Sequence, residues 1–185
     1  MSKHAPARFR SYIAAHDRHM VQLRSTTFVG ADSLRLIAQP SLILMVGDIG
    51  CLGNIRVTVE KYLAIVTPKA TPSEVLDGDH DIAVQTIAYA YHASIADYGA
   101  ILRYDNNHPW PRHADNHHVH RCDWRDRDDD SGRVEWIGAD RWPTLGDVVR
   151  EVMDWYFVNR DELPEPDAYA TPLAREPRTR WNPLA

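Results

Sequence analysis

The chain has 185 residues, of which 44% are hydrophobic and 25% charged, with a formal net charge of -5 and two cysteines. This composition is typical of a globular protein, and the length predicts one domain rather than two. The negative charge excludes a broad surface for polyanions, and two isolated cysteines exclude a disulfide framework.

The most apolar run, residues 41–46, is far shorter than the roughly 20 residues that a membrane-spanning helix needs. The N-terminal segment is basic but lacks the continuous apolar stretch of a secretory signal. We therefore expect a cytoplasmic protein without a membrane partner.

Residues 5–23 have apolar side chains at roughly helical spacing and basic side chains on the opposite face. This pattern predicts an amphipathic helix within a basic N-terminal extension, residues 1–40. Two interpretations are open: a helix packed on the domain, or an arm that contacts nucleic acid.

Six segments are predicted to form strands of an antiparallel sheet. Residues 53–60 alternate strictly between apolar and polar side chains, and residues 83–95 resume the alternation after a connecting loop at 68–81. The other four candidates are residues 42–46, 101–106, 117–124 and 134–137.

A change of period after Pro143 predicts a helix over residues 144–160, and Thr144 and Asp147 have the spacing of a capping box. Its apolar stripe needs a sheet to cover. We therefore expect an α+β fold, in which an antiparallel β-sheet meander has the N-terminal helix and this C-terminal helix packed on one face. Residues 41–163 form this domain, and residues 164–185, with five prolines, form an irregular tail.

Five of the ten histidines lie within thirteen residues, directly after the segment Arg103-Tyr104-Asp105-Asn106. They are His108, His113, His117, His118 and His120. On a strand, His118 and His120 share a face, and so do Arg103 and Asp105, while Tyr104 and Asn106 share the other. If the two strands are neighbours, one of these pairs lies beside the two histidines.

Three interpretations of the cluster compete. The histidines act as general acid and base on RNA, with Arg103 stabilising the phosphorane. Alternatively, His118 and His120 bind zinc, iron or manganese together with Asp105 or His108. In the third interpretation, the cluster is a structural polar rim. The sequence has no phosphate-binding loop, dinucleotide fingerprint or nucleophile elbow.

The order of these motifs resembles the TumE family of toxins from prokaryotic toxin-antitoxin modules. The resemblance rests on Arg103-Tyr-Asp-Asn106, His117-His-Val-His120 and the helix opened by Trp142-Pro-Thr-Leu145, and covers roughly residues 53–160. It implies a growth-inhibiting toxin of a type II-like module. Its partner is then a cognate antitoxin with a helix-turn-helix or winged-helix DNA-binding domain.

By analogy with small α+β toxins that attack RNA, we expect a metal-independent ribonuclease without a cofactor. The candidate catalytic residues are His118, His120, Arg103, Tyr104 and Asp105, and the candidate substrate-binding residues are Asn106, His108, His113 and His117. The alternative is a non-enzymatic or metal-binding interaction protein of the same module.

Overall fold

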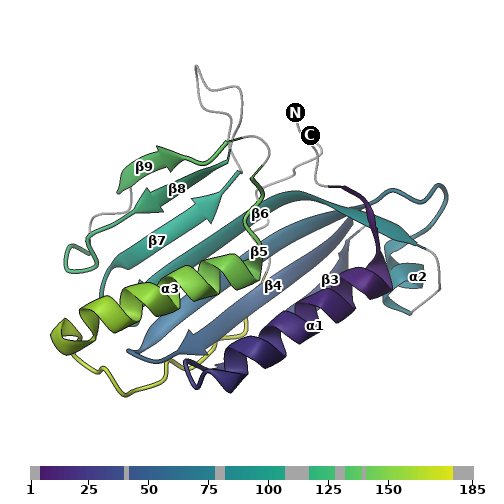
Figure 1. Ribbon diagram of the computed structural model, residues 1–185. Helices are drawn as coiled ribbons and strands as arrows, with labels where there is room; N and C mark the ends of the chain where they lie inside the picture. Colours follow the sequence, from purple (N-terminus) through teal and green to yellow (C-terminus); the bar gives the residue numbers. More distant parts are fainter. Residues whose placement is uncertain are drawn as a thin grey trace.

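The computed structural model describes residues 5–39, 42–77, 82–106, 117–127, 132–138 and 141–176. Within these ranges, nine strands form one antiparallel sheet, and two long helices cover one of its faces (Figure 1). The predicted α+β fold is therefore confirmed. No helix in the described ranges is both long enough and apolar enough to cross a membrane.

The strands are β1 (Ala7–Arg8), β2 (Val29–Asp32), β3 (Arg35–Gln39), β4 (Leu42–Cys51), β5 (Ile55–Ile65), β6 (Ala83–Ile95), β7 (Ala100–Asp105), β8 (His118–Arg121) and β9 (Arg133–Trp136). The helices are α1 (Phe9–Ser25), α2 (Pro72–Leu76) and α3 (Leu145–Asn159), followed by the 3₁₀ helix η1 (Arg160–Glu162).

Strands β4 to β9 form the predicted meander, because each pairs antiparallel with the next along the chain. Strand β6 spans the residues whose alternation predicted it. The prediction was wrong about the loop at 68–81, where Thr71 and Glu74 form a capping box that begins α2. It also missed β1, β2 and β3, which are short strands at the margin of the sheet.

Strands β2 and β3 pair with successive halves of β4. The chain passes from one to the other at Ser33, directly over Gly47 of β4. A Cβ atom at Gly47 would lie 2.6 Å from the Ser33 carbonyl oxygen, so this crossing requires a residue without a side chain. Close backbone packing of this kind gives no periodic signal in the sequence.

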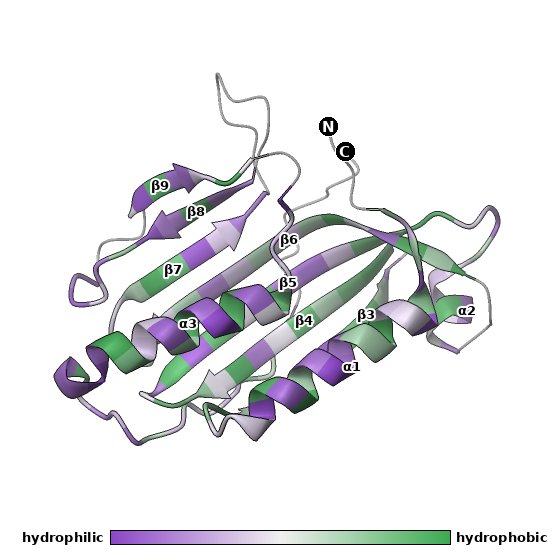
Figure 2. Cartoon of the chain, in the orientation of Figure 1, coloured by the Kyte–Doolittle hydropathy of each residue, from purple (hydrophilic) through white to green (hydrophobic). Residues whose placement is uncertain are grey.

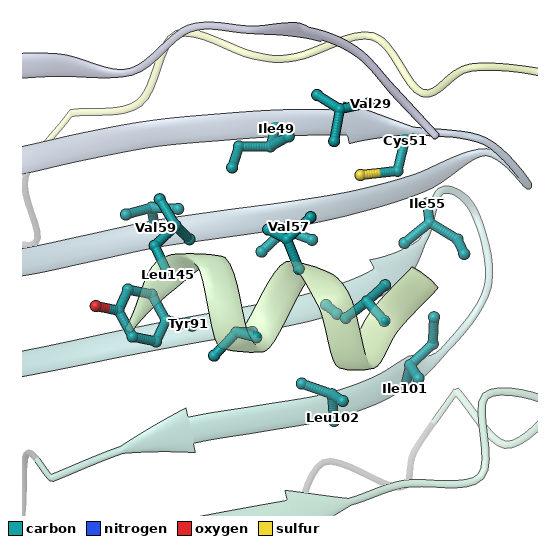
Figure 3. Packing of buried hydrophobic residues seen from close by; sticks show 14 of the residues in the cluster. Val29, Ile49, Cys51, Ile55, Val57, Val59, Tyr91, Ile101, Leu102 and Leu145 are labelled. Carbon is teal, nitrogen blue, oxygen red and sulfur yellow. The ribbon is translucent and has the colours of Figure 1, made fainter. Parts of the chain in front are cut away.

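The main hydrophobic core lies between the sheet and the two long helices. Helix α3 buries its predicted stripe of Val148, Val149, Val152 and Tyr156, and its Thr144–Asp147 capping box is present. Figure 3 shows Leu145 above strand residues such as Val59. Helix α1 adds Met20 and Leu23 to the same core, which supports the interpretation of a helix packed on the domain.

The face of the sheet away from α1 and α3 is called the outer face below. Figure 2 colours the strands by hydropathy, and in it β4 is mostly hydrophobic and β8 mostly hydrophilic. All ten residues of β4 are buried. Part of that burial comes from residues 164–176, the yellow segment in Figure 1, which run along the β4 end of this face.

The C-terminal segment has little regular structure, yet it is bound to the sheet. The backbone of Ala170 donates to Cys51, and that of Leu173 donates to the buried carboxylate of Asp48. Arg175 Nε donates to both oxygens of Asp48, at 3.0 and 3.1 Å, and Arg56 Nε lies 3.5 Å from the same carboxylate. A fully buried carboxylate is stabilised in this way by two cations and a backbone amide.

Candidate functional site

Strands β7 and β8 bring the two polar motifs of the sequence together. In their register, Arg103 pairs with His120 and Asp105 pairs with His118. Because side chains alternate along a strand, all four lie on the same side of the sheet. They lie on the outer face, because Leu102 and Tyr104, which flank Arg103 along β7, belong to the core under α3.

Three of these side chains form a compact buried cluster. One ligand-type atom from each of Asp105, His118 and His120 lies within 4.8 Å of the others. His118 Nε2 is 3.1 Å from Asp105 Oδ1, and the two imidazole rings are 4.9 Å apart between centroids. The exposed fractions are 3%, 0% and 5%, so bulk water is largely excluded from all three.

Arg103 lies at the rim of the cluster and contacts two of its members. Its Nε donates to Asp105 Oδ2 at 3.0 Å, and its Nη2 donates to His120 Nε2, also at 3.0 Å. Since arginine is only a donor, the His120 nitrogen accepts. The Arg103 side chain keeps 34% exposure, which makes it the most accessible part of the group.

Neighbouring strands extend the polar surface in both directions. On β9, Trp136 pairs with His118, and their rings are 5.1 Å apart between centroids. On β6, His92 pairs with Arg103, and Ala90 lies between Asp105 and the buried Glu60 of β5. On the outer face the cluster is therefore flanked by the Trp136 ring on one side and, beyond Ala90, by the Glu60 carboxylate on the other.

Tyr104 and His117 lie on the opposite, helix-covered face, separate from the Asp105, His118 and His120 cluster. The Tyr104 hydroxyl donates to Glu151 of α3. The pKa of Tyr104 is raised, mainly by burial and also by this carboxylate. His117 Nδ1 is 2.8 Å from the Tyr89 hydroxyl, and its ring packs 4.3 Å from that of Trp142. The cause is the two-residue period of the strands, which sends successive side chains to opposite faces.

Asn106 follows β7 directly and extends its pairing with β6. Its Oδ1 accepts from the Tyr89 amide at 2.8 Å, and its Nδ2 donates to the Ile87 carbonyl at 3.3 Å. These contacts add to the backbone bond that the Asn106 amide donates to the Tyr89 carbonyl at 3.3 Å. The remaining two candidates, His108 and His113, lie outside the described residues.

Sequence reasoning did not identify Trp136, Glu60 or His92 as neighbours of the cluster. Residues 134–137 were predicted to form a strand, and alternation placed every second residue on one face. Which of these residues meets His118 depends on the register between β8 and β9. The long connections on both sides of β8 leave that register open.

One carboxylate and two imidazoles form a ligand set suited to zinc, iron or manganese. Arg103 would orient the Asp105 carboxylate from outside such a site by donating a hydrogen bond to the oxygen that the metal does not use. Comparison with protein-family models, curated proteins and solved structures found no match. The function of this site is therefore argued from its own geometry.

Proposed function

We propose that Asp105, His118 and His120 bind one divalent transition metal ion, zinc being the first candidate. The observation that supports this is the convergence of their ligand atoms within 4.8 Å in a site closed to bulk water. Direct acid–base work on RNA requires these imidazoles to touch the polymer. A His118 side chain with 0% exposure is poorly placed for that contact, but well placed for a metal.

A zinc ion with three protein ligands keeps a position for water or substrate and polarises what binds there. Arg103 is a partly exposed cation beside this open coordination position, so it favours an anionic ligand such as a phosphate ester. We therefore propose hydrolysis of a phosphate-containing substrate as the reaction class. Arg103 contacts the substrate, and Trp136 shields the His118 side of the centre.

Metal binding by His120 requires one change in its hydrogen bonding. Its Nε2 accepts a hydrogen bond from Arg103, so an ion bound at that nitrogen replaces the Arg103 N–H. The exposure of Arg103 leaves its guanidinium room to turn toward solvent or substrate.

The test is metal binding by the purified full-length chain. We expect cobalt(II), used as a spectroscopic substitute for zinc, to bind at about one ion per chain and give ligand-field bands of a site with nitrogen and oxygen ligands. The His118→Ala and His120→Ala variants lose these bands. His92→Ala is the matched control, because His92 lies on the same face but outside the cluster. Equal binding by wild type and the His118→Ala, His120→Ala double variant refutes the site.

A second candidate function follows from the Arg103–His120 contact. In that contact His120 Nε2 is the hydrogen-bond acceptor, the role that a general base takes toward a hydroxyl proton, while His118 lies against the Asp105 carboxylate. In this version the protein is the toxin of a two-gene module, as the resemblance to TumE toxins implies, and a metal-independent ribonuclease by analogy with small α+β toxins. It acts in the cytoplasm and is neutralised by a DNA-binding antitoxin encoded beside it.

Induced expression in a bacterial host distinguishes the two versions. The toxin proposal predicts growth arrest and RNA fragmentation with wild type and with His92→Ala, but not with the His118→Ala, His120→Ala variant. A soluble, folded wild-type chain that permits normal growth contradicts the toxin proposal. Cleavage of RNA by the purified chain in the presence of a chelator supports acid–base chemistry, whereas loss that zinc restores supports the metal centre.

A further inference from the structure

A cavity of about 270 Å³ lies on the helix-covered face of the sheet, between α1, β5 and the beginning of α3. Its polar lining comes from His16 and His19 of α1, Lys61 of β5, and Thr144 with Gly146 at the start of α3. The Asp105, His118 and His120 cluster is on the other face. The cavity is therefore independent of the function proposed above.

Lys61 is the unusual group in this cavity. It is one of three lysines in the chain, and it is largely enclosed, whereas Lys69 is exposed. Its ammonium lies 4.8 Å from the centre of the Tyr12 ring. Among the residues that the structure describes, no carboxylate pairs with Lys61 and no hydrogen bond is made to it.

The beginning of α3 adds backbone N–H donors, next to the Asp147 carboxylate, which is bound to Thr144. The Thr144 side chain accepts from the Asp147 amide, which leaves the amides of Leu145 and Gly146 as the first N–H groups of a 15-residue helix. Such groups have no acceptor inside their helix and favour an anion in front of them. Gly146 lines the cavity, where a Cβ atom would lie 3.6 Å from His19 Nδ1.

A bound anion would offset the physical cost of burying Lys61. A buried cation without a counter-charge destabilises a fold, and burial lowers the pKa of Lys61 to about 8. The group is still mostly an ammonium at pH 7. A methionine would fill similar space without this cost.

We propose that this cavity binds a small organic anion, with its carboxylate or phosphate group between the Lys61 ammonium and the first amides of α3. Tyr12, Ala15 and Leu145 provide an apolar wall for the carbon part of the ligand. The volume suits a small molecule and excludes a polymer.

The test is an amide NMR titration of the full-length chain with inorganic phosphate and, separately, with butyrate, at constant ionic strength maintained with chloride. We expect at least one of the two anions to shift the Leu145 and Gly146 amide signals saturably and to raise the melting temperature. Lys61→Met weakens this binding by roughly tenfold or more, which is the loss of one charge-assisted contact. Lys69→Met, which removes an exposed lysine of the same length, leaves the affinity unchanged.

A second variant keeps the test decisive if Lys61→Met does not fold. Ala15→Met places a longer side chain in the cavity and keeps the lysine, so it blocks the ligand without removing the charge. The proposal is overturned if neither anion gives a saturable shift at these amides. It is equally overturned if a folded Lys61→Met or Ala15→Met variant binds as tightly as wild type.

Discussion

Asp48 and Arg175 are 127 residues apart in the chain, and Arg175 Nε donates to both oxygens of the buried Asp48 carboxylate. This contact, together with the Leu173 amide, connects the end of the described chain to the centre of β4. The C-terminal segment is therefore part of the folded domain, although its composition predicts an irregular tail.

Replacement of Arg175 tests how much this connection contributes. Arg175→Ala removes one of two cations from a carboxylate that stays buried, so we expect a loss of about 1 to 3 kcal/mol and faster hydrogen exchange at the Leu173 amide. Chemical denaturation and amide exchange measure the two effects. Arg150→Ala is the control, because Arg150 is exposed and lies 3.7 Å from the exposed Asp147, so its loss changes stability little. Equal effects of the two substitutions contradict the importance of Asp48.

Tyr91 and Tyr156 provide a matched pair of buried hydroxyls. The Tyr91 hydroxyl has no hydrogen-bond partner among the described residues, whereas that of Tyr156 donates to the Pro166 carbonyl at 3.0 Å. Removing an unsatisfied buried hydroxyl relieves a desolvation cost, while removing a satisfied one leaves an acceptor behind. We expect Tyr91→Phe to be neutral or stabilising and Tyr156→Phe to cost about 1 kcal/mol, measured by thermal unfolding. A larger loss of stability in Tyr91→Phe than in Tyr156→Phe contradicts this assignment of hydrogen bonds.

Lys61 gives the protein a specific dependence of stability on pH. Its pKa is about 8 in the folded state against an ordinary value of 10.5, so between these values the unfolded chain binds more protons. The stability contributed by this group therefore rises with pH across that window and is lowest below pH 8. We expect Lys61→Met to exceed wild type in stability at pH 7, with the difference shrinking toward pH 10.5. A difference that is constant with pH shows that the lysine is not destabilised by burial.

Tyr104 distinguishes the two faces of β7. It was predicted among the catalytic residues, but its hydroxyl donates to Glu151 on the helix-covered side. Tyr104→Phe is expected to lower stability by about 1 to 2 kcal/mol and to leave cobalt binding unchanged. Asp105→Asn, one residue away on the outer face, abolishes cobalt binding instead. Loss of the metal in Tyr104→Phe contradicts the separation of the two faces.

The sequence predicts the central meander and α3 well, because both have a strong period. Strand β6 alternates over residues 83–88 and again over 89–95, with a change of phase at a bulge between them, and the apolar stripe of α3 begins directly after its capping box. Strand β2, Val-Gly-Ala-Asp, has no such pattern. It forms because β4 offers a pairing partner, which is a tertiary cause that a local reading of the chain does not detect.

The sequence predicts only part of the candidate site, because periodicity describes each strand but not how two strands pair. Alternation along each strand separates Arg103 and Asp105 from Tyr104, and joins His118 with His120. It does not decide which pair faces the histidines, since that depends on how β7 and β8 pair. The register places Asp105 against His118, and Trp136 reaches His118 through a second register. Both contacts depend on the pairing of neighbouring strands, which the sequence of a single strand does not determine.

The close passage of the C-terminal segment over β4 also has a consequence for biosynthesis. A Cβ atom at Gly50 would lie 2.0 Å from the Ala170 carbonyl oxygen, so this crossing forms only over a bare backbone. Asp48 is synthesised long before Arg175, so its contacts with Arg175 and the Leu173 amide form only after the whole meander has been synthesised. The β4 end of the outer face is therefore completed by a segment made after the rest of the sheet.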